Sequence, residues 1–147
     1  AGSALLWATR RTTFRHFCGG ETLQECVETS RRLAAGGSVR CIVDWSTEEQ
    51  EDESAWDRNA EKKAETLRLF AEALGSNAAF VPVKLTALVS PRLLEQVTSS
   101  ILAGEQEPLA GLAEAERARW DAALERLRVL CAAARDSRVG LLLDAEQ

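Results

Sequence analysis

The sequence has a single histidine, no methionine and no C-x-x-C pair among its four cysteines. A zinc site needs several histidine or cysteine ligands at close spacing, so we expect no metal, and nothing in the cysteine spacing indicates a disulfide framework. We predict that Cys18, Cys26, Cys41 and Cys131 are reduced thiols. Because His16 is the sole candidate base for a nucleophilic triad, we expect it to be structural.

Long apolar runs and basic patches are also missing. No apolar run approaches the ~20 residues of a membrane-spanning helix. The net charge of −5 offers no basic field for nucleic acid, which we exclude as a partner. With 46% apolar residues, the 147-residue chain can bury the core of one globular domain.

The first residues differ from the rest of the chain in charge. The absence of methionine indicates that an initiator or a longer presequence preceded Ala1. Residues 1–11 carry Arg10 and Arg11 and no acid, which suits either the remnant of a transit peptide or a solvated arm. We treat residues 1–12 as an N-terminal arm and residues 13–147 as one domain.

The domain alternates short apolar runs with helical patterns. β-Branched, aromatic and aliphatic composition predicts strands at 13–18, 39–43, 80–85 and 139–143. Pro82 fits its strand only where no amide donor is needed. Thr22 and Glu25 form a capping-box pattern that begins a helix ending near Gly36. Three more helices are predicted. One follows the acidic linker 48–53, one begins after Ser90 and Pro91, and one contains the apolar residues of 120–131.

Strands that alternate with helices in this way predict parallel β/α units. The alternatives are an open doubly wound sheet and part of a (β/α) barrel. No G-x-G-x-x-G or Walker loop follows any strand, which disfavours the nucleotide-binding open sheets. Asp44, Lys84 and Asp144 lie at or next to predicted strand ends, where a barrel gathers its chemistry. We therefore predict an α/β fold of the (β/α)8 TIM-barrel type, represented by its first four β/α units.

Four runs at these strands resemble the successive first strand motifs of proline dehydrogenases. They are HFCGGET (16–22), VDWSTEE (43–49), VKLTAL (83–88) and LDAEQ (143–147), in the family's order. The lead-in at 13–17 is more similar to the eukaryotic, mitochondrial branch. The resemblance implies a distorted barrel that holds FAD and oxidises L-proline to pyrroline-5-carboxylate, with electrons passing to a quinone.

The resemblance also assigns roles to individual residues. Lys84 matches the lysine that helps to hold the substrate carboxylate, and Asp144 matches the catalytic aspartate beside the flavin. Ala145 matches a position whose backbone meets the cofactor. Glu48 resembles a loop glutamate that gates the pocket, although a solvated loop residue is the alternative reading. Lys84 and Asp144 would stay ionised if they lay within ~4–6 Å of each other.

The chain stops after the fourth motif, and the later strands of the family are missing from it. We expect a second polypeptide to supply the rest of the barrel, mitochondrial localisation in the matrix or at the inner membrane, and peripheral membrane contact through quinone reduction. No helix in the sequence has the basic, amphipathic pattern of a membrane-surface helix. Two alternatives stay open: an inactive half-barrel accessory subunit of a larger mitochondrial complex, and a hydroxyproline dehydrogenase.

Three tryptophans, Trp45, Trp56 and Trp120, are expected to pack against other side chains rather than to stack on a flavin.

Overall fold

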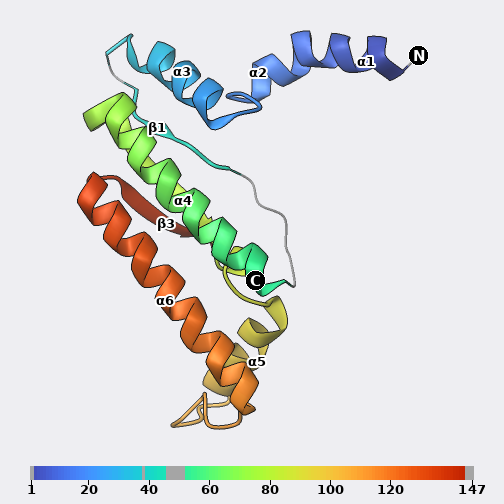
Figure 1. Ribbon diagram of the computed structural model, residues 1–147, viewed down its shortest axis with the longest axis vertical. Helices are drawn as coiled ribbons and strands as arrows, with labels where there is room; N and C mark the ends of the chain where they lie inside the picture. The colour runs from blue at the N-terminus through green and yellow to red at the C-terminus, as the bar shows by residue number, and fades with distance from the viewer. Residues whose placement is uncertain (1, 38, 46–51, 145–147) are drawn as a thin grey trace.

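A computed structural model of the chain describes residues 2–37, 39–45 and 52–144. It is an α/β structure of long helices and a small parallel sheet (Figure 1). In chain order the elements are α1 (Gly2–Thr9), the π-helical segment η1 (Arg10–Phe14), α2 (Arg15–Phe17), α3 (Leu23–Ala34), β1 (Cys41–Ile42), α4 (Glu53–Leu74), the 3₁₀ turn η2 (Gly75–Asn77), β2 (Ala78–Lys84), the 3₁₀ turn η3 (Leu85–Ala87), α5 (Pro91–Leu102), α6 (Glu114–Ser137) and β3 (Gly140–Asp144).

The first predicted strand is wrong, because residues 13–17 are helical. The arm α1–η1–α2 runs away from the rest of the molecule (Figure 1). A strand needs a neighbour for its N–H and C=O groups, and none of the described strands lies beside this segment, whereas a helix satisfies these groups internally. The hydroxyl of Thr12 donates to the carbonyl of Ala8 at 2.7 Å, and Arg10 pairs with Glu21 at 2.7 Å. Local hydrogen bonding therefore outweighs the strand propensity of this run.

The predicted helices form, with small shifts at their ends. The backbone N–H of Glu25 donates to the Thr22 hydroxyl at 3.2 Å, so Thr22 is the N-cap of α3. The Glu25 carboxylate accepts from the N–H of Glu21 at 2.7 Å, one residue before the position that a standard capping box uses. α3 ends at Ala34, and Gly37 adopts a positive φ of 93° beyond it.

The sheet has three parallel strands in the order β1-β2-β3, so β2 is central. β2 pairs with β3 over five residue pairs, from Phe80 opposite Gly140 to Lys84 opposite Asp144. Pro82 is tolerated in this central strand for a clear reason. The carbonyl of Phe80 accepts from Val43 of the β1 segment, so Pro82, two residues on, turns its nitrogen toward the same side. It lies beyond the last recorded β1 pair, Ile42–Phe80, where no ladder donor is required.

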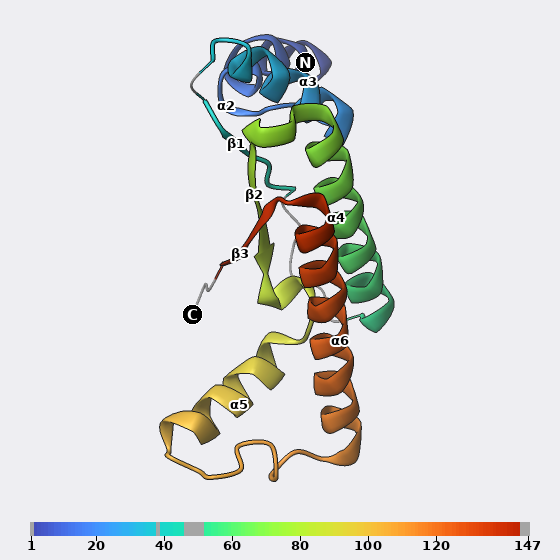
Figure 2. The ribbon, with the colours of Figure 1, turned by 90° about the vertical axis from the view of Figure 1, so that its left-hand side faces the viewer.

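Helices α4 and α6 pack on one face of the sheet (Figure 2). The residues of β2 that point to them, Val81 and Val83, are completely buried. They meet the most buried side chains of the two helices, which are Leu67, Phe70 and Leu130. α3 extends the same core at the far end of α4, and α5 packs separately against the start of α6.

The opposite face of the sheet is uncovered by any described element (Figure 2). Ile42, Phe80 and Leu142 point to this face and are 54%, 37% and 39% exposed, although all three are apolar. Three parallel strands with helices on one face are compatible with the wall of a β/α barrel, whose inner side would be this open face.

Candidate functional site at the carboxyl ends of the strands

Lys84 and Asp144 end two neighbouring strands. The register of β2 and β3 pairs them directly, so their backbones are one strand spacing apart, about 4.8 Å. Side chains alternate between the faces of a strand, which places both residues on the open face with Phe80 and Leu142. Lys84 is half-buried and Asp144 is exposed. The structure therefore brings together the two residues to which the resemblance assigns substrate binding and catalysis.

The open face between these charges is an apolar surface. Gly140 lies opposite Phe80, and the Phe80 ring occupies the space that a Cβ at 140 would need. The ring consequently lies close against the backbone of β3 at Gly140. An exposed apolar surface that ends in one cation and one carboxylate suits a small zwitterion beside a planar ring system.

A third charged residue, Asp44, follows β1 at the same edge of the sheet. Its carboxylate accepts from the Nζ of Lys63 at 3.1 Å, and the same Nζ donates to the carbonyl of Trp45 at 2.9 Å. The Lys63 side chain is 4% exposed, whereas that of Asp44 is 48% exposed. Burial lowers the pKa of Lys63, Asp44 raises it, and the charge of Lys84 lowers it further. Lys84 thus lies near enough to act on the buried ammonium.

The sequence reading did not select Lys63. On α4 it lies between Ala60 and Leu67 in the stripe of buried residues that faces the sheet. The sequence signal that could have identified Lys63 is its place in this apolar stripe, because a lysine is almost never buried there without a partner. A buried lysine predicts a carboxylate at the adjacent strand end, and Asp44 is that carboxylate.

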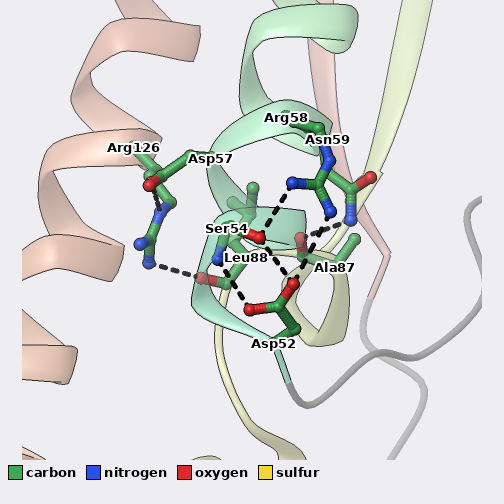
Figure 3. Close-up of polar contacts among 8 residues, drawn as sticks. All are labelled: Asp52, Ser54, Asp57, Arg58, Asn59, Ala87, Leu88 and Arg126. Atoms are coloured by element: carbon green, nitrogen blue, oxygen red, sulfur yellow. Dashed lines mark hydrogen bonds and ion pairs between the residues drawn. The ribbon is translucent and has the colours of Figure 1, made fainter.

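A buried polar network holds the chain immediately after Lys84 (Figure 3). The Nδ2 of Asn59 on α4 donates to the carbonyl of Ala87 at 3.1 Å. The Nη1 of Arg126 on α6 donates to the carbonyl of Leu88 at 3.0 Å, while its Nε pairs with Asp57 at 2.7 Å. Two helices therefore fix the turn η3 that leaves the end of β2.

The N-terminus of α4 has its own polar cap in the same region (Figure 3). The Asp52 carboxylate accepts from the backbone N–H and the hydroxyl of Ser54, and Arg58 lies 3.6 Å from it. The hydrogen bonds from Ser54 lower the pKa of Asp52, with a smaller contribution from Arg58. An ionised cap at this position favours the helix and anchors its first turn.

Two of the predicted site residues, Glu48 and Ala145, lie outside the described residues, so their roles stay predictions. Trp56 is buried in the core and lies under the Arg126 guanidinium, 5.6 Å from ring centroid to Cζ, as a packing residue would. His16 makes an edge contact with the ring of Phe17 on the arm. It is far along the chain from the strand ends.

Other features of the described residues do not add to this site. A groove of about 400 Å³ between α3 and α4 is lined by Leu23, Val27 and Leu69, near the opposite end of the sheet. Within the described ranges, no three His, Cys, Asp or Glu side chains gather to hold a metal ion. None of the described helices is long and apolar enough to cross a bilayer. All four cysteines are unpaired thiols.

No model of a known protein family matches the chain. The carbapenem antibiotics biosynthesis protein CarD of Pectobacterium carotovorum subsp. carotovorum is 33% identical over 89% of this chain and 32% of CarD. Mitochondrial proline dehydrogenase 2 of Arabidopsis thaliana is 25% identical over 97% of this chain and 35% of its own length. Mitochondrial proline dehydrogenase 1 of Dictyostelium discoideum is 34% identical over 60% of this chain and 15% of its own length.

These similarities are distant, and the chain spans about a third of the length of CarD and of the Arabidopsis protein. The sequence is thus proline dehydrogenase-like. The matches include a bacterial protein as well as mitochondrial ones.

Proposed function

We propose that this chain forms part of a flavin-dependent proline dehydrogenase and carries one side of its active site. The observation that carries the proposal is the direct pairing of Lys84 with Asp144 at the ends of adjacent parallel strands. Both residues were assigned from motifs that lie 60 positions apart in the sequence. Their convergence on one open, apolar face supports a common site, and the similarity to proline dehydrogenases supports the reaction.

The substrate's charges fit this arrangement. L-Proline carries a carboxylate and a ring ammonium, and its five-membered ring is otherwise apolar. The Lys84 ammonium would bind the carboxylate as a compact cation. Phe80 and Leu142 would contact the ring, and Asp144 would lie beside the ring nitrogen.

In the reaction, a C–H bond of the ring carbon next to nitrogen breaks and its hydrogen leaves with the bonding pair. The nitrogen loses a proton and a C=N double bond forms, which gives pyrroline-5-carboxylate. The residues of this chain need only orient the ring, exclude water from its apolar side and supply a cation for the carboxylate and an anion beside the nitrogen.

FAD, when bound, would accept the hydride. The apolar face formed by Ile42, Phe80 and Leu142 fits a planar ring of that kind, and Asp144 stands at its edge. The described residues include no glycine-rich phosphate loop, so the dinucleotide tail would be held by other parts of the protein. Ala145 is the proposed backbone contact to the cofactor, and Glu48 the proposed gate.

The exposed apolar face and the two open edges, β1 and β3, favour completion by further polypeptide. We propose that additional β/α units, from a second polypeptide, close the sheet into a barrel over this face. The mitochondrial relatives support localisation in mitochondria. We propose a quinone at the inner membrane as the electron acceptor.

The similarity to CarD favours a second candidate function, in the biosynthesis of a carbapenem-type compound. A carbapenem nucleus also has a five-membered ring with a carboxylate on the carbon next to nitrogen, so Lys84 could hold both substrates. The nitrogen differs: it is a β-lactam amide nitrogen and carries no positive charge.

The first experiment is the visible absorption spectrum of the purified protein, recorded without oxygen before and after adding L-proline. We expect flavin bands that bleach with L-proline. Lys84→Met should raise the proline concentration for half-bleaching about tenfold or more, the value of one charge-assisted contact. Lys62→Met is the matched control, since Lys62 is exposed beside Trp45.

A spectrum without flavin, or a flavin indifferent to L-proline, would contradict the proposal and favour the accessory role. A flavin that bleaches with a bicyclic β-lactam carboxylate and not with L-proline would select the second candidate. Bleaching by hydroxyproline alone would select that substrate instead.

A further inference from the structure

The Asp44–Lys63 pair lies at the proposed site but takes no part in the function described so far. The Nζ of Lys63 is 3.1 Å from the Asp44 carboxylate and 2.9 Å from the Trp45 carbonyl. Two contacts from one almost fully buried ammonium fix both the side chain and the backbone that follow β1. Asp44 is half-exposed, so the buried lysine holds a carboxylate that is open to solvent.

Asp44 lies at the same carboxyl edge of the sheet as the proposed site, and 48% of its side chain is exposed even though its carboxylate reaches Lys63 of α4. Along β1 and just beyond it, the buried residues Cys41 and Val43 alternate with exposed Ile42, and Asp44, two residues after the strand, is exposed as well. The register is irregular between Cys41 and Ile42, and a regular continuation from Ile42 opposite Phe80 would put Asp44 level with Pro82, one strand away. Lys84 lies two residues further along β2 than Pro82, so a shift of two residues along the strand and one strand sideways separates the Cα atoms of Asp44 and Lys84 by roughly 8 Å.

The strand ends consequently present an alternating row of charges: Asp44 just after β1, Lys84 on β2 and Asp144 on β3. Behind this row lies the second cation, Lys63, whose pKa is lowered by burial and by the charge of Lys84. Two lysines and two aspartates make the cluster neutral in sum. A neutral cluster with separated charges matches a zwitterion better than it matches a simple anion or cation.

We propose that Asp44, positioned by Lys63, is a further binding residue of this site and receives the ammonium group of an amino-acid substrate while Lys84 receives its carboxylate. This inference rests on the proposed function and names the chemistry that its site selects. It assigns Lys63 a positioning role, because its ammonium is buried behind Asp44 and would not touch the substrate. It also separates the two candidate functions, since a β-lactam nitrogen gives Asp44 no positive charge to bind.

The test measures equilibrium binding by calorimetry with three probes on the full, cofactor-loaded protein, whose flavin is reduced beforehand and kept without oxygen so that L-proline is bound and not oxidised. L-Proline carries both charges, pyrrolidine only the ammonium, and cyclopentanecarboxylate only the carboxylate. The main variant is Asp44→Asn, which keeps an acceptor oxygen for Lys63 but removes the charge. We expect it to weaken L-proline and pyrrolidine about tenfold or more and to change cyclopentanecarboxylate less than about twofold.

Lys63→Met should give the same pattern, because Asp44 loses the partner that orients it, and Lys63→Arg should restore part of the loss. Lys62→Met is the control one position away, on the exposed side of α4, and should change none of the three affinities. Should Lys63→Met fail to fold, Asp44→Asn still decides the outcome. Unchanged pyrrolidine and L-proline binding in Asp44→Asn would overturn the inference, and so would an equal loss for all three probes.

Lys84→Met distinguishes this failure from a failure of the proposed function. If Lys84→Met weakens L-proline and cyclopentanecarboxylate while Asp44→Asn weakens nothing, only the role of Asp44 is refuted. If the unaltered protein binds neither L-proline nor cyclopentanecarboxylate, the proposed function fails and this inference fails with it.

Discussion

Replacing Arg126 by methionine should lower the free energy of unfolding by about 2–4 kcal/mol, although the residue lies on a helix that is largely exposed. The Arg126 side chain is only 10% exposed. It joins three parts of the structure: its Nη1 holds the Leu88 carbonyl, its Nε holds Asp57, and its guanidinium lies over Trp56 (Figure 3).

The magnitude follows from what the substitution leaves behind. Leu88 is 2% exposed, and a buried carbonyl that loses its donor costs about 1–3 kcal/mol. The ion pair with Asp57, whose carboxylate is mostly exposed, contributes about 0–1 kcal/mol. The contact with Trp56 adds about 0.5–1 kcal/mol, part of which the methionine side chain would replace by packing. The unpaired Leu88 carbonyl therefore accounts for most of the expected loss of stability.

The assay is urea-induced unfolding followed by tryptophan fluorescence, in which buried Trp56 reports on the same junction. Arg128→Met is the control on the same helix, because Arg128 is 71% exposed and, among the described residues, pairs with Glu125 at 3.3 Å. We expect the control to change stability by less than about 0.5 kcal/mol. Equal effects of the two variants would refute the reasoning that the carbonyl after β2 depends on Arg126.

Three further predictions concern the core, the close approach of two strands, and pH. Leu130→Ala should lower the free energy of unfolding in urea by about 2–5 kcal/mol, because Leu130 is fully buried. Val129 is half-exposed, so Val129→Ala should lower it by less than about 1 kcal/mol. Gly140→Ala should destabilise the protein by about 1–3 kcal/mol, since its methyl group would meet the ring of Phe80. When Phe80 is already alanine, adding Gly140→Ala should cost much less, because the ring that the methyl group would meet is gone. Because the pKa of Lys63 is lowered from 10.5 in the folded state, the unfolded state binds more protons between the lowered value and pH 10.5. Unfolding free energy should therefore gain a rising contribution with pH across that range, and Lys63→Met should remove it; an identical pH profile in the variant would contradict this.

The order and type of most elements could be predicted from sequence, because their signals are local. Thr22 caps α3 and Pro91 begins α5 where the sequence predicts, and Gly75 ends α4. Each of these residues acts through the backbone conformation or the hydrogen bonds of its own turn. The prediction failed at residues 13–18, where a strand would need a partner that the local sequence cannot supply.

The candidate site divides in the same way. Lys84 and Asp144 were found from motifs and from their positions at strand ends, and parallel strands bring such ends to one edge. Asn59, Lys63 and Arg126 were missed, because each lies within a helix and acts on a segment 19 to 38 residues away. Their partners are backbone carbonyls or a strand-end carboxylate, and no sequence period marks these.

From Thr22 onward, the sequence by itself determined the succession of helices and parallel strands, the helix ends, and the residue types at the strand ends, since all of these depend on side-chain periodicity and local hydrogen bonds. Only the tertiary structure decided that one face of the sheet is covered and the other open, that Lys84 stands opposite Asp144, and that a buried lysine holds Asp44. Those features depend on register and on the burial of charge, which arise when distant segments pack and share hydrogen bonds away from water.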